Sequence, residues 1–285
     1  MIPPYFDIPL PPSEDSLSIK DKKTNKTGIR IAIIHLPQIS NFTDFELLEQ
    51  QASVEYVQPG GATLSSFDCI IIPGTKNTIT DLQYLYDSGF AYQIHAAHTA
   101  GIPVIGICGG YQMLGKTITD SGQESAEGTY QGLGLLDITT TFLEYTKTTV
   151  QVTRTPLNHP PPILQRMEQV SGYEIHAGET SVGHSKRAFE DEGAVSDDGQ
   201  VFGTYMHGLF LNRTAVDALL SCLSDKKGTA YTPAESTNPI YDDTAYDTVA
   251  RSFERSLDVQ TLLAIAKEGR PDTKSRPSAD DGENA

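Results

Sequence analysis

The sequence predicts an α/β fold with an open, mixed and largely parallel sheet that is flanked by helices. In the first half of the chain, short apolar runs alternate with a stretch whose apolar residues recur at helical spacing, as in β-α-β units. Each run is continuously apolar, which is typical of strands buried on both faces of a sheet. The last two runs end in turns that contain glycine, where sheets of this type place their sites.

The first half of the chain supplies the parallel strands. Between the third and fourth apolar runs, helical spacing predicts a single helix over residues 77–100, which Asn77 or Thr78 would cap and Gly101 would end. The four strands are expected at residues 29–34, 54–57, 67–72 and 103–107.

The second half is rich in Thr, Val and Tyr, and it predicts an antiparallel extension of the same sheet. Residues 157–168 and 184–199 have the composition of loops, and helices over residues 213–223 and 245–267 would close the domain. The further strands are expected at residues 132–142, 148–155, 171–176 and 201–207.

The two ends of the chain differ from its middle. Residues 1–28 are rich in Pro, Ser and charged residues without a period, so they predict a linker or the remnant of a preceding domain. Residues 29–269 form the expected domain, and residues 270–285 form an acidic tail that we expect to be disordered.

The composition argues against several kinds of partner. Asp and Glu number 37 against 21 Lys and Arg, and the formal charge of −16 disfavours binding to nucleic acid or to anionic membranes. No run approaches the roughly 18 apolar residues of a membrane span, and the first residues lack the pattern of a signal peptide, so a cytoplasmic protein is expected. Cys69, Cys108 and Cys222 form no Cys-x-x-Cys pair, so neither a disulfide framework nor a metal site is expected.

The strongest functional signal is the segment Gly106-Ile107-Cys108-Gly109-Gly110, between a predicted strand and a segment able to start a helix. This pattern is typical of a nucleophile elbow with sulfur in place of oxygen. The glycines let a strained turn close, so the Cys108 thiol would be presented rather than packed. The first amides of the following helix favour the thiolate form of such a cysteine.

Two other interpretations of this segment stay open. Residues 110–117 match the phosphate-binding pattern G-x-x-x-x-G-K-T, although the bulky residues between the glycines are more typical of a helix that packs inward. Cys108 could also be a small buried apolar residue, as free cysteines often are. Its place between glycines at the end of a strand favours the nucleophile.

A thiol nucleophile needs a base and donors for an oxyanion. Among the seven histidines, His207 is favoured because it lies beside a glycine at the carboxyl end of an apolar strand, and His176 is the second choice. The backbone N–H of Gly109 and the turn that contains Gly74 are the candidate oxyanion donors.

With these motifs in place, the chain resembles the class I glutamine amidotransferases, which have a flavodoxin-like core. It resembles more closely the glutaminase domain of the cobyric acid synthases, over most of the sequence. The resemblance rests on five ordered motifs, at residues 36–45, 72–78, 106–115, 172–176 and 203–210.

The resemblance implies that Cys108 attacks the side-chain amide of L-glutamine, which gives a glutamyl thioester and ammonia while His207 moves the protons. It also implies that the oxyanion is held at Gly74 and Gly109. The positions that it assigns to substrate binding are Gln112, Tyr173 and His176.

The resemblance further implies a partner, a synthetase domain that uses ATP and Mg²⁺ and amidates a corrinoid a,c-diamide with the ammonia. Neither that domain nor a cofactor site is expected in this chain, which we therefore interpret as a fragment or as one subunit of a split enzyme. Many class I enzymes have a glutamate two residues after the catalytic histidine, where this chain has Leu209. A Cys-His dyad is expected, with an unidentified group orienting His207.

Two alternative functions stay open. The chain could be the glutaminase subunit of a peptidoglycan-precursor amidotransferase, although the motif at residues 39–45 argues against it. It could also be a non-catalytic interaction module that retains an old site.

Overall fold

A computed structural model places residues 28–143, 149–157, 162–233 and 258–268, together with Asp247, Ala250, Arg251, Glu254 and Arg255. The chain divides into two compact units. The larger unit, Ser13–Ile240, contains every predicted site residue, and the helix α8 (Val259–Glu268) belongs to the other unit. Among the residues placed in this way, none of the helices is long and apolar enough to cross a membrane.

A six-stranded sheet forms the centre of the larger unit, with the strand order β11-β12-β4-β3-β1-β2. Neighbouring strands pair in parallel, except that the edge strand β11 is antiparallel to β12. Every residue of β3, β4 and β12 is buried, as continuous apolar runs predict. The strands are β1 (Arg30–Ile34), β2 (Ser53–Val57), β3 (Cys69–Ile72), β4 (Val104–Ile107), β11 (Ala194–Val195) and β12 (Val201–Thr204).

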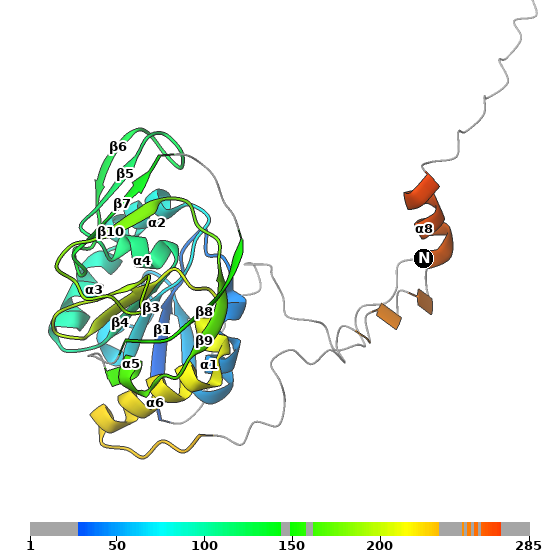
Figure 1. The fold of residues 1–285 in the computed structure, drawn as a ribbon. Helices are drawn as coiled ribbons and strands as arrows, with labels where there is room; N and C mark the ends of the chain where they lie inside the picture. The colour runs from blue at the N-terminus through cyan, green and yellow to red at the C-terminus, as the bar shows by residue number, and fades with distance from the viewer. Residues whose placement is uncertain are drawn as a thin grey trace, which may run out of the picture. The chain divides into compact units, whose positions relative to one another are not determined.

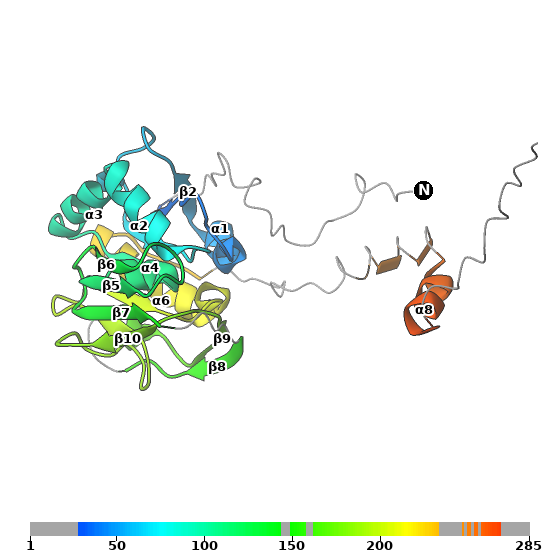
Figure 2. The same cartoon turned by 90° about the horizontal axis from the view of Figure 1, so that it is seen from above.

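Helices flank this sheet in two groups (Figure 1, Figure 2). In one group α2 contacts both α3 and α4, and in the other α1 and α5 both contact α6. The predicted mixed, largely parallel sheet between helices is therefore confirmed. The helices are α1 (Glu46–Gln51), α2 (Thr78–Asp87), α3 (Phe90–Thr99), α4 (Gly109–Met113), α5 (Pro162–Arg166) and α6 (Arg213–Lys227), with the 3-10 turns η3 (Phe42–Phe45), η4 (Leu64–Ser66) and η5 (Leu209–Leu211).

The single helix predicted over residues 77–100 is wrong, because two helices, α2 and α3, occupy this stretch. Between them Gly89 has a φ of 80°, a left-handed conformation that glycine adopts without steric cost. The predicted cap is confirmed, since the Asn77 side chain accepts a hydrogen bond from the Thr80 N–H at 2.8 Å.

The predicted antiparallel extension of the central sheet is wrong for the strands that were predicted to form it. β12 joins that sheet in parallel beside β4, and only β11, in a predicted loop, adds to it in an antiparallel way. The other strands of this half form two separate sheets, one with the order β10-β7-β5-β6 and one that pairs β8 with β9. Buried and more exposed residues alternate in β5 and β7, so these strands bury only one face. The strands are β5 (Thr117–Asp120), β6 (Gly128–Gln131), β7 (Ile138–Phe142), β8 (Val150–Arg154), β9 (Val170–Glu174) and β10 (Glu179–Val182).

Several predicted boundaries in this half change as well. The strand expected at residues 132–142 is only β7, because Gly132 packs against the turn after α4, where an added Cβ would lie 2.2 Å from the Gly115 carbonyl oxygen. The two predicted loops contain α5 and β11. The predicted helix at residues 213–223 is confirmed as α6, and the one at residues 245–267 is described mainly as α8, with much of its first half outside the described residues.

The turn from β4 into α4 is very tightly packed. A Cβ at Gly110 would lie 2.0 Å from the carbonyl oxygen of Ile72 on the neighbouring strand. We expect Gly110→Ala to lower the free energy of unfolding by about 3 kcal/mol, because backbone atoms on both sides resist displacement. Urea unfolding followed by circular dichroism measures this change.

Gly128→Ala is the matched control for that experiment, because the nearest atom to an added Cβ there is 3.8 Å away. Its free energy of unfolding is expected to stay within about 0.5 kcal/mol of the wild-type value. Equal losses in the two variants would contradict the packing argument.

Candidate active site

Cys108 lies at the turn between β4 and α4, with φ 51° and ψ −110°. Among the described residues, the only other non-glycine residue with a positive φ is Asn41. Strain of this kind is typical of nucleophile elbows. The Cys108 N–H donates to the Thr204 carbonyl oxygen at 2.8 Å, which ties the turn to β12. The turn therefore holds the Cys108 thiol at the carboxyl end of the central sheet, as the sequence predicts. The prediction that this thiol is presented rather than packed is wrong, because Cys108 is buried and its thiol lies 3.7 Å from the Ile175 carbonyl oxygen.

The segment after Cys108 is the helix α4, and its Tyr111 and Met113 side chains are buried. A phosphate-binding loop exposes backbone amides to an anion, whereas this segment packs inward. Lys116, the lysine of the phosphate-loop pattern, pairs instead with Asp137 at 2.6 Å. These contacts favour the nucleophile elbow over the phosphate loop at residues 110–117.

The two predicted oxyanion positions meet beside the thiol. A Cβ at Gly109 would lie 2.7 Å from Thr75 Cγ2, so the turn after β3 packs directly against the start of α4. A Cβ at Gly74 would lie 2.8 Å from His207 Cε1 and 3.6 Å from Cys108 Cβ. Gly109 opens α4, and the first N–H groups of a helix have no acceptor within it. The structure thus brings the four predicted catalytic and oxyanion positions together.

His207 is held by a carboxylate. Its Nδ1 lies 2.7 Å from Asp44 Oδ2, and the other carboxylate oxygen of Asp44 accepts a hydrogen bond from the Gly208 N–H at 3.0 Å. Both side chains are buried. An acceptor at Nδ1 fixes the ring orientation and places a proton on that nitrogen, so Nε2 is the nitrogen that can exchange protons with a nucleophile.

Burial lowers the pKa of His207, but the Cys108 thiolate and the Asp44 carboxylate raise it more, and the result is a pKa of about 10. His207 Nε2 is buried, and no described residue lies in hydrogen-bond geometry with it. Catalytic hydrogen bonds are often long or poorly aligned before substrate binds. The arrangement suits an imidazolium at His207 beside Cys108.

Tyr173, which belongs to the predicted motif at residues 172–176, stacks on the ring of His207. The two rings stack with their centroids 5.3 Å apart, and the two backbones exchange hydrogen bonds of 2.8 and 3.1 Å. The Tyr173 hydroxyl accepts a hydrogen bond from the Asn41 side-chain amide. A polar pocket of about 240 Å³ opens beside this ring, and residues 39–43 and Lys76 form the rest of its wall. The structure therefore places Tyr173 next to His207.

Gln112 and His176 meet at Tyr205. Gln112 is buried: its amide oxygen accepts from the Thr78 hydroxyl at 2.8 Å, and its amide nitrogen donates to the Ala177 carbonyl oxygen at 2.9 Å and to the Tyr205 hydroxyl at 3.1 Å. Both of its N–H donors are used, so Gln112 could donate a hydrogen bond to a ligand only by exchanging one of these bonds. The His176 ring stacks on Tyr205 with the centroids 3.6 Å apart.

Asp44 is the functional candidate that the sequence reasoning missed. It lies in η3, 163 positions before His207, so no local spacing rule links the two residues. The signal was present, since Asp44 belongs to the motif at residues 36–45 on which the resemblance rests. Leu209, which stands at the usual position of the acid, is buried in the core.

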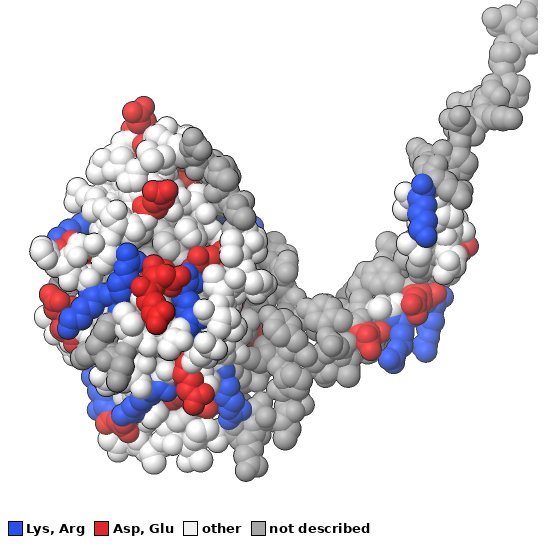
Figure 3. All heavy atoms as spheres, in the orientation of Figure 1, with Lys and Arg blue, Asp and Glu red and all other residues white. Residues whose placement is uncertain are grey.

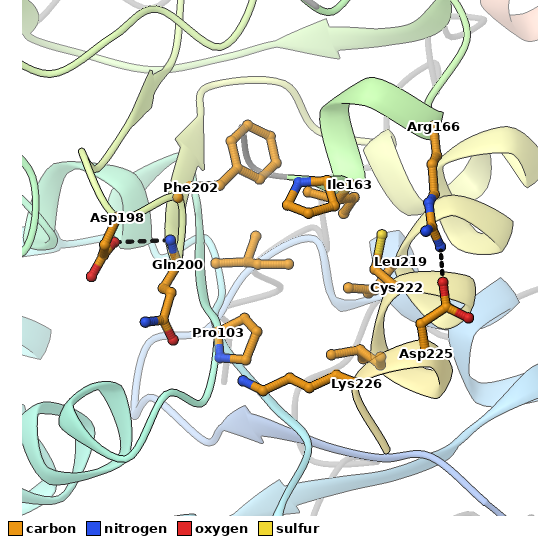
Figure 4. Close-up of a pocket in the computed structure, with 14 residues that line it drawn as sticks. Pro103, Ile163, Arg166, Asp198, Gln200, Phe202, Leu219, Cys222, Asp225 and Lys226 are labelled. Atoms are coloured by element: carbon orange, nitrogen blue, oxygen red, sulfur yellow. Dashed lines mark hydrogen bonds and ion pairs between the residues drawn. The ribbon is translucent and has the colours of Figure 1, made fainter. Parts of the chain in front are cut away.

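The rest of the described surface offers other features. A largely apolar pocket of about 290 Å³ lies at the amino ends of β4 and β12, and the ion pair between Arg166 and Asp225, at 2.7 Å, lies on one side of it (Figure 4). It contains none of the predicted site residues.

Acidic and basic side chains intermingle on the face shown in Figure 3. Within the described ranges, no cluster of three or more His, Cys, Asp or Glu residues could hold a metal ion.

Comparisons with known proteins identify the family of this chain. The family model of the CobB/CobQ-like glutamine amidotransferase domain matches residues 30–215. A "Probable cobyric acid synthase" of Methanosphaerula palustris is 54% identical over 95% of this chain and 54% of its own length, and one of Methanosarcina mazei is 47% identical over 92% of this chain and 53% of its own length. The chain spans about half the length of the curated relatives it matches.

Solved structures support the fold. "Structure of PurLQS from Thermotoga maritima" covers 70% of this chain and 99% of the matched chain, with a TM-score of 0.50 and 16% sequence identity. A second structure, titled "Crystal structure of glutamine amidotransferase", covers 70% of this chain and 100% of its own, with a TM-score of 0.50 and 14% identity. At these identities the likeness shows a shared fold.

Proposed function

The chain belongs to the CobB/CobQ-like glutamine amidotransferase family, and we propose that it hydrolyses the side-chain amide of L-glutamine through a thioester on Cys108. The observation that carries this proposal is the strained Cys108 elbow beside a buried His207–Asp44 pair. A nucleophile, a base and a group that orients the base are the three parts of a covalent acyl-transfer site.

In the proposed mechanism the Cys108 thiolate attacks the amide carbon of glutamine, and a carbon–sulfur bond forms while the carbonyl π electrons move to oxygen. The backbone N–H groups at Gly74 and Gly109 stabilise this oxyanion. The His207 imidazolium protonates the amide nitrogen, the carbon–nitrogen bond breaks and ammonia leaves. The products of this half-reaction are ammonia and a glutamyl thioester.

Water completes the reaction. His207 takes a proton from the attacking water through Nε2, and the carbon–sulfur bond of the second tetrahedral intermediate breaks to release glutamate and the thiolate. Asp44 accepts the Nδ1 proton in a hydrogen bond throughout, so it keeps the ring oriented and stabilises the imidazolium. Tyr173 and His176 would contact the substrate from the segment 172–176.

The acceptor of the ammonia belongs to the other half of the proposed enzyme. Both relatives named above are called probable cobyric acid synthases and are about twice as long as this chain. We infer that the ammonia passes to an ATP- and Mg²⁺-dependent synthetase domain or subunit, which amidates peripheral carboxylates of a corrinoid a,c-diamide. These names favour a corrinoid over a peptidoglycan precursor as the acceptor.

Product analysis tests the proposal. The purified chain, alone and with the synthetase half of the Methanosphaerula relative, is expected to release glutamate and ammonia in equal amounts from L-glutamine. L-Asparagine, which is shorter by one methylene, should react about 10- to 200-fold more slowly. With ATP, Mg²⁺ and the corrinoid diamide, the mixture should form corrinoid amides. No glutamate release under either condition would contradict the glutaminase, and glutamate release without corrinoid amide would contradict only the acceptor.

A further inference from the structure

One buried carboxylate near the site has no part in this mechanism. Asp81 lies in the first turn of α2 and is fully buried. Its Oδ2 accepts hydrogen bonds from the Thr75 hydroxyl at 2.5 Å and from the Gln38 N–H at 3.2 Å, whereas its Oδ1 makes no hydrogen bond to any described residue. Burying a carboxylate with so few partners is costly, so its place in the core needs a reason.

The two partners of Asp81 come from the two loops that meet at the candidate site. Thr75 directly follows Gly74 in the oxyanion turn, and its Cγ2 packs on Gly109. Gln38 begins the segment that leads to Asp44, the carboxylate that holds the base.

Further backbone bonds join the same two loops. The Ser40 N–H donates to the Gly74 carbonyl oxygen at 2.9 Å, and the Lys76 N–H donates to the Gln38 carbonyl oxygen at 2.9 Å. The carboxylate of Asp81 therefore lies where the oxyanion turn and the segment leading to Asp44 are fastened together.

We propose that Asp81 is a positioning residue, which holds the oxyanion turn at Gly74 against the segment that leads to Asp44. This inference rests on the proposed glutaminase function. With both loops fixed to one carboxylate, the oxyanion donors and the His207–Asp44 pair keep their relative geometry. Preorganised donors of this kind act on the charge that develops in the transition state, so Asp81 affects kcat more than glutamine binding.

The ionisation of Asp81 is compatible with this role. Burial raises the pKa of its carboxyl group to about 6, while the hydrogen bonds from Thr75 and Gln38 act in the opposite direction. At pH 8 the group is therefore ionised and acts only as an acceptor, which matches the two donors that face it. Assays at pH 8 therefore measure the ionised form of Asp81 in the wild-type chain.

A purely structural role is the competing explanation, because an acidic residue in the first turn of a helix stabilises that helix. Asn77 already caps α2. The two explanations differ in what they predict for transition-state binding, since loss of helix stability lowers the free energy of unfolding without a selective effect on an oxyanion.

The experiment compares Asp81→Leu, which removes both acceptor oxygens, with Asp81→Asn, which keeps one. We expect kcat for glutamine to fall about 100-fold in the first variant and about 10-fold in the second, with KM within about threefold of the wild-type value. Asp87→Asn is the matched control, because Asp87 is exposed on the same helix. It should keep wild-type kcat.

A second readout uses glutamate γ-semialdehyde as the probe. The Cys108 thiolate adds to its aldehyde carbon, the π electrons of the carbonyl move to oxygen, and the resulting oxyanion lies where the amide oxyanion would form. We expect the inhibition constant of this aldehyde to rise by the same factor as kcat falls. In a Cys108→Ala background, the Asp81 substitutions should change the dissociation constant of glutamine less than threefold, which is the margin also expected for KM.

Thr75→Val provides an independent variant if Asp81→Leu does not fold, because it removes the hydroxyl that faces Asp81. The same hydroxyl also lies 3.0 Å from the Gln38 carbonyl oxygen and accepts a hydrogen bond from the Asn77 N–H at 3.2 Å. This variant should weaken aldehyde binding in the same direction. Unchanged kcat and unchanged aldehyde affinity in Asp81→Asn and Thr75→Val would overturn the inference, whatever their unfolding free energies. Absence of glutamine hydrolysis by the wild-type chain would instead count against the proposed function, and the aldehyde affinities would still decide the role of Asp81.

Discussion

Replacing Cys108 with alanine is expected to lower kcat for glutamine hydrolysis by about 10⁴-fold or more, because no other described group at the site can form the thioester. Glutamine binding should be affected much less, since the substrate contacts proposed at the segment 172–176 remain. A coupled glutamate assay and binding calorimetry measure the two effects separately.

Cys222, one of the two remaining cysteines, serves as the control for that result. Cys222 is half-buried on α6 at the apolar pocket of Figure 4, away from the predicted site residues, and Cys222→Ala should keep full activity. Cys69 is fully buried in β3. Full glutamine hydrolysis by Cys108→Ala would refute the thioester.

Replacing Asp44 with asparagine is expected to lower kcat by about 10²- to 10⁴-fold. The uncharged amide no longer stabilises the His207 imidazolium, and its N–H group can face Nδ1 and select the wrong tautomer. The loss of kcat should appear with little change in KM, because Asp44 contacts the base and not the substrate.

The pKa of His207 gives a direct reading of the same change. The Asp44 carboxylate helps to raise this pKa to about 10, so its removal should bring the pKa down. A titration of the imidazole signals by NMR in the wild-type chain and in Asp44→Asn follows the shift.

Asp225→Asn is the control for the Asp44 experiment. It breaks only the exposed ion pair with Arg166, which is worth at most about 1 kcal/mol. Wild-type kcat and an unshifted His207 pKa in Asp44→Asn would contradict the proposed role of the carboxylate.

The central sheet could be predicted because its signal is local. β1, β3 and β4 are continuous apolar runs, and burial on both faces requires that pattern. β5 and β6 were missed because they give little apolar signal: each is four residues long, only Ile118 and Asp120 are buried in β5, and no residue of β6 is buried. The break at Gly89 was missed because the apolar spacing continues across it, so only the backbone conformation marks the end of α2.

The residues of the candidate site could likewise be predicted only where their signal is local in the sequence. Cys108 and Gly109 were predictable from the elbow because its glycines are close together in the sequence, although Gly109 and Gly110 are required by contacts with the distant turn after β3. Asp44 and Asp81 were not, because each acts across the fold: Asp44 on His207 and Asp81 on Gln38 and Thr75. A carboxylate in a short motif gives no sign of its partner until the chain is folded.

The central claim is that Cys108 is the nucleophile for a glutamine-like substrate, and a covalent trap tests it most directly. The chain is treated with a chloroketone analogue of glutamine, digested and analysed by mass spectrometry, with excess L-glutamine as competitor. We predict one adduct per chain, on the Cys108 peptide, that glutamine suppresses and that Asp44→Asn slows. Labelling of Cys69 or Cys222 at the same rate, or labelling of Cys108 that glutamine does not suppress, would contradict the claim.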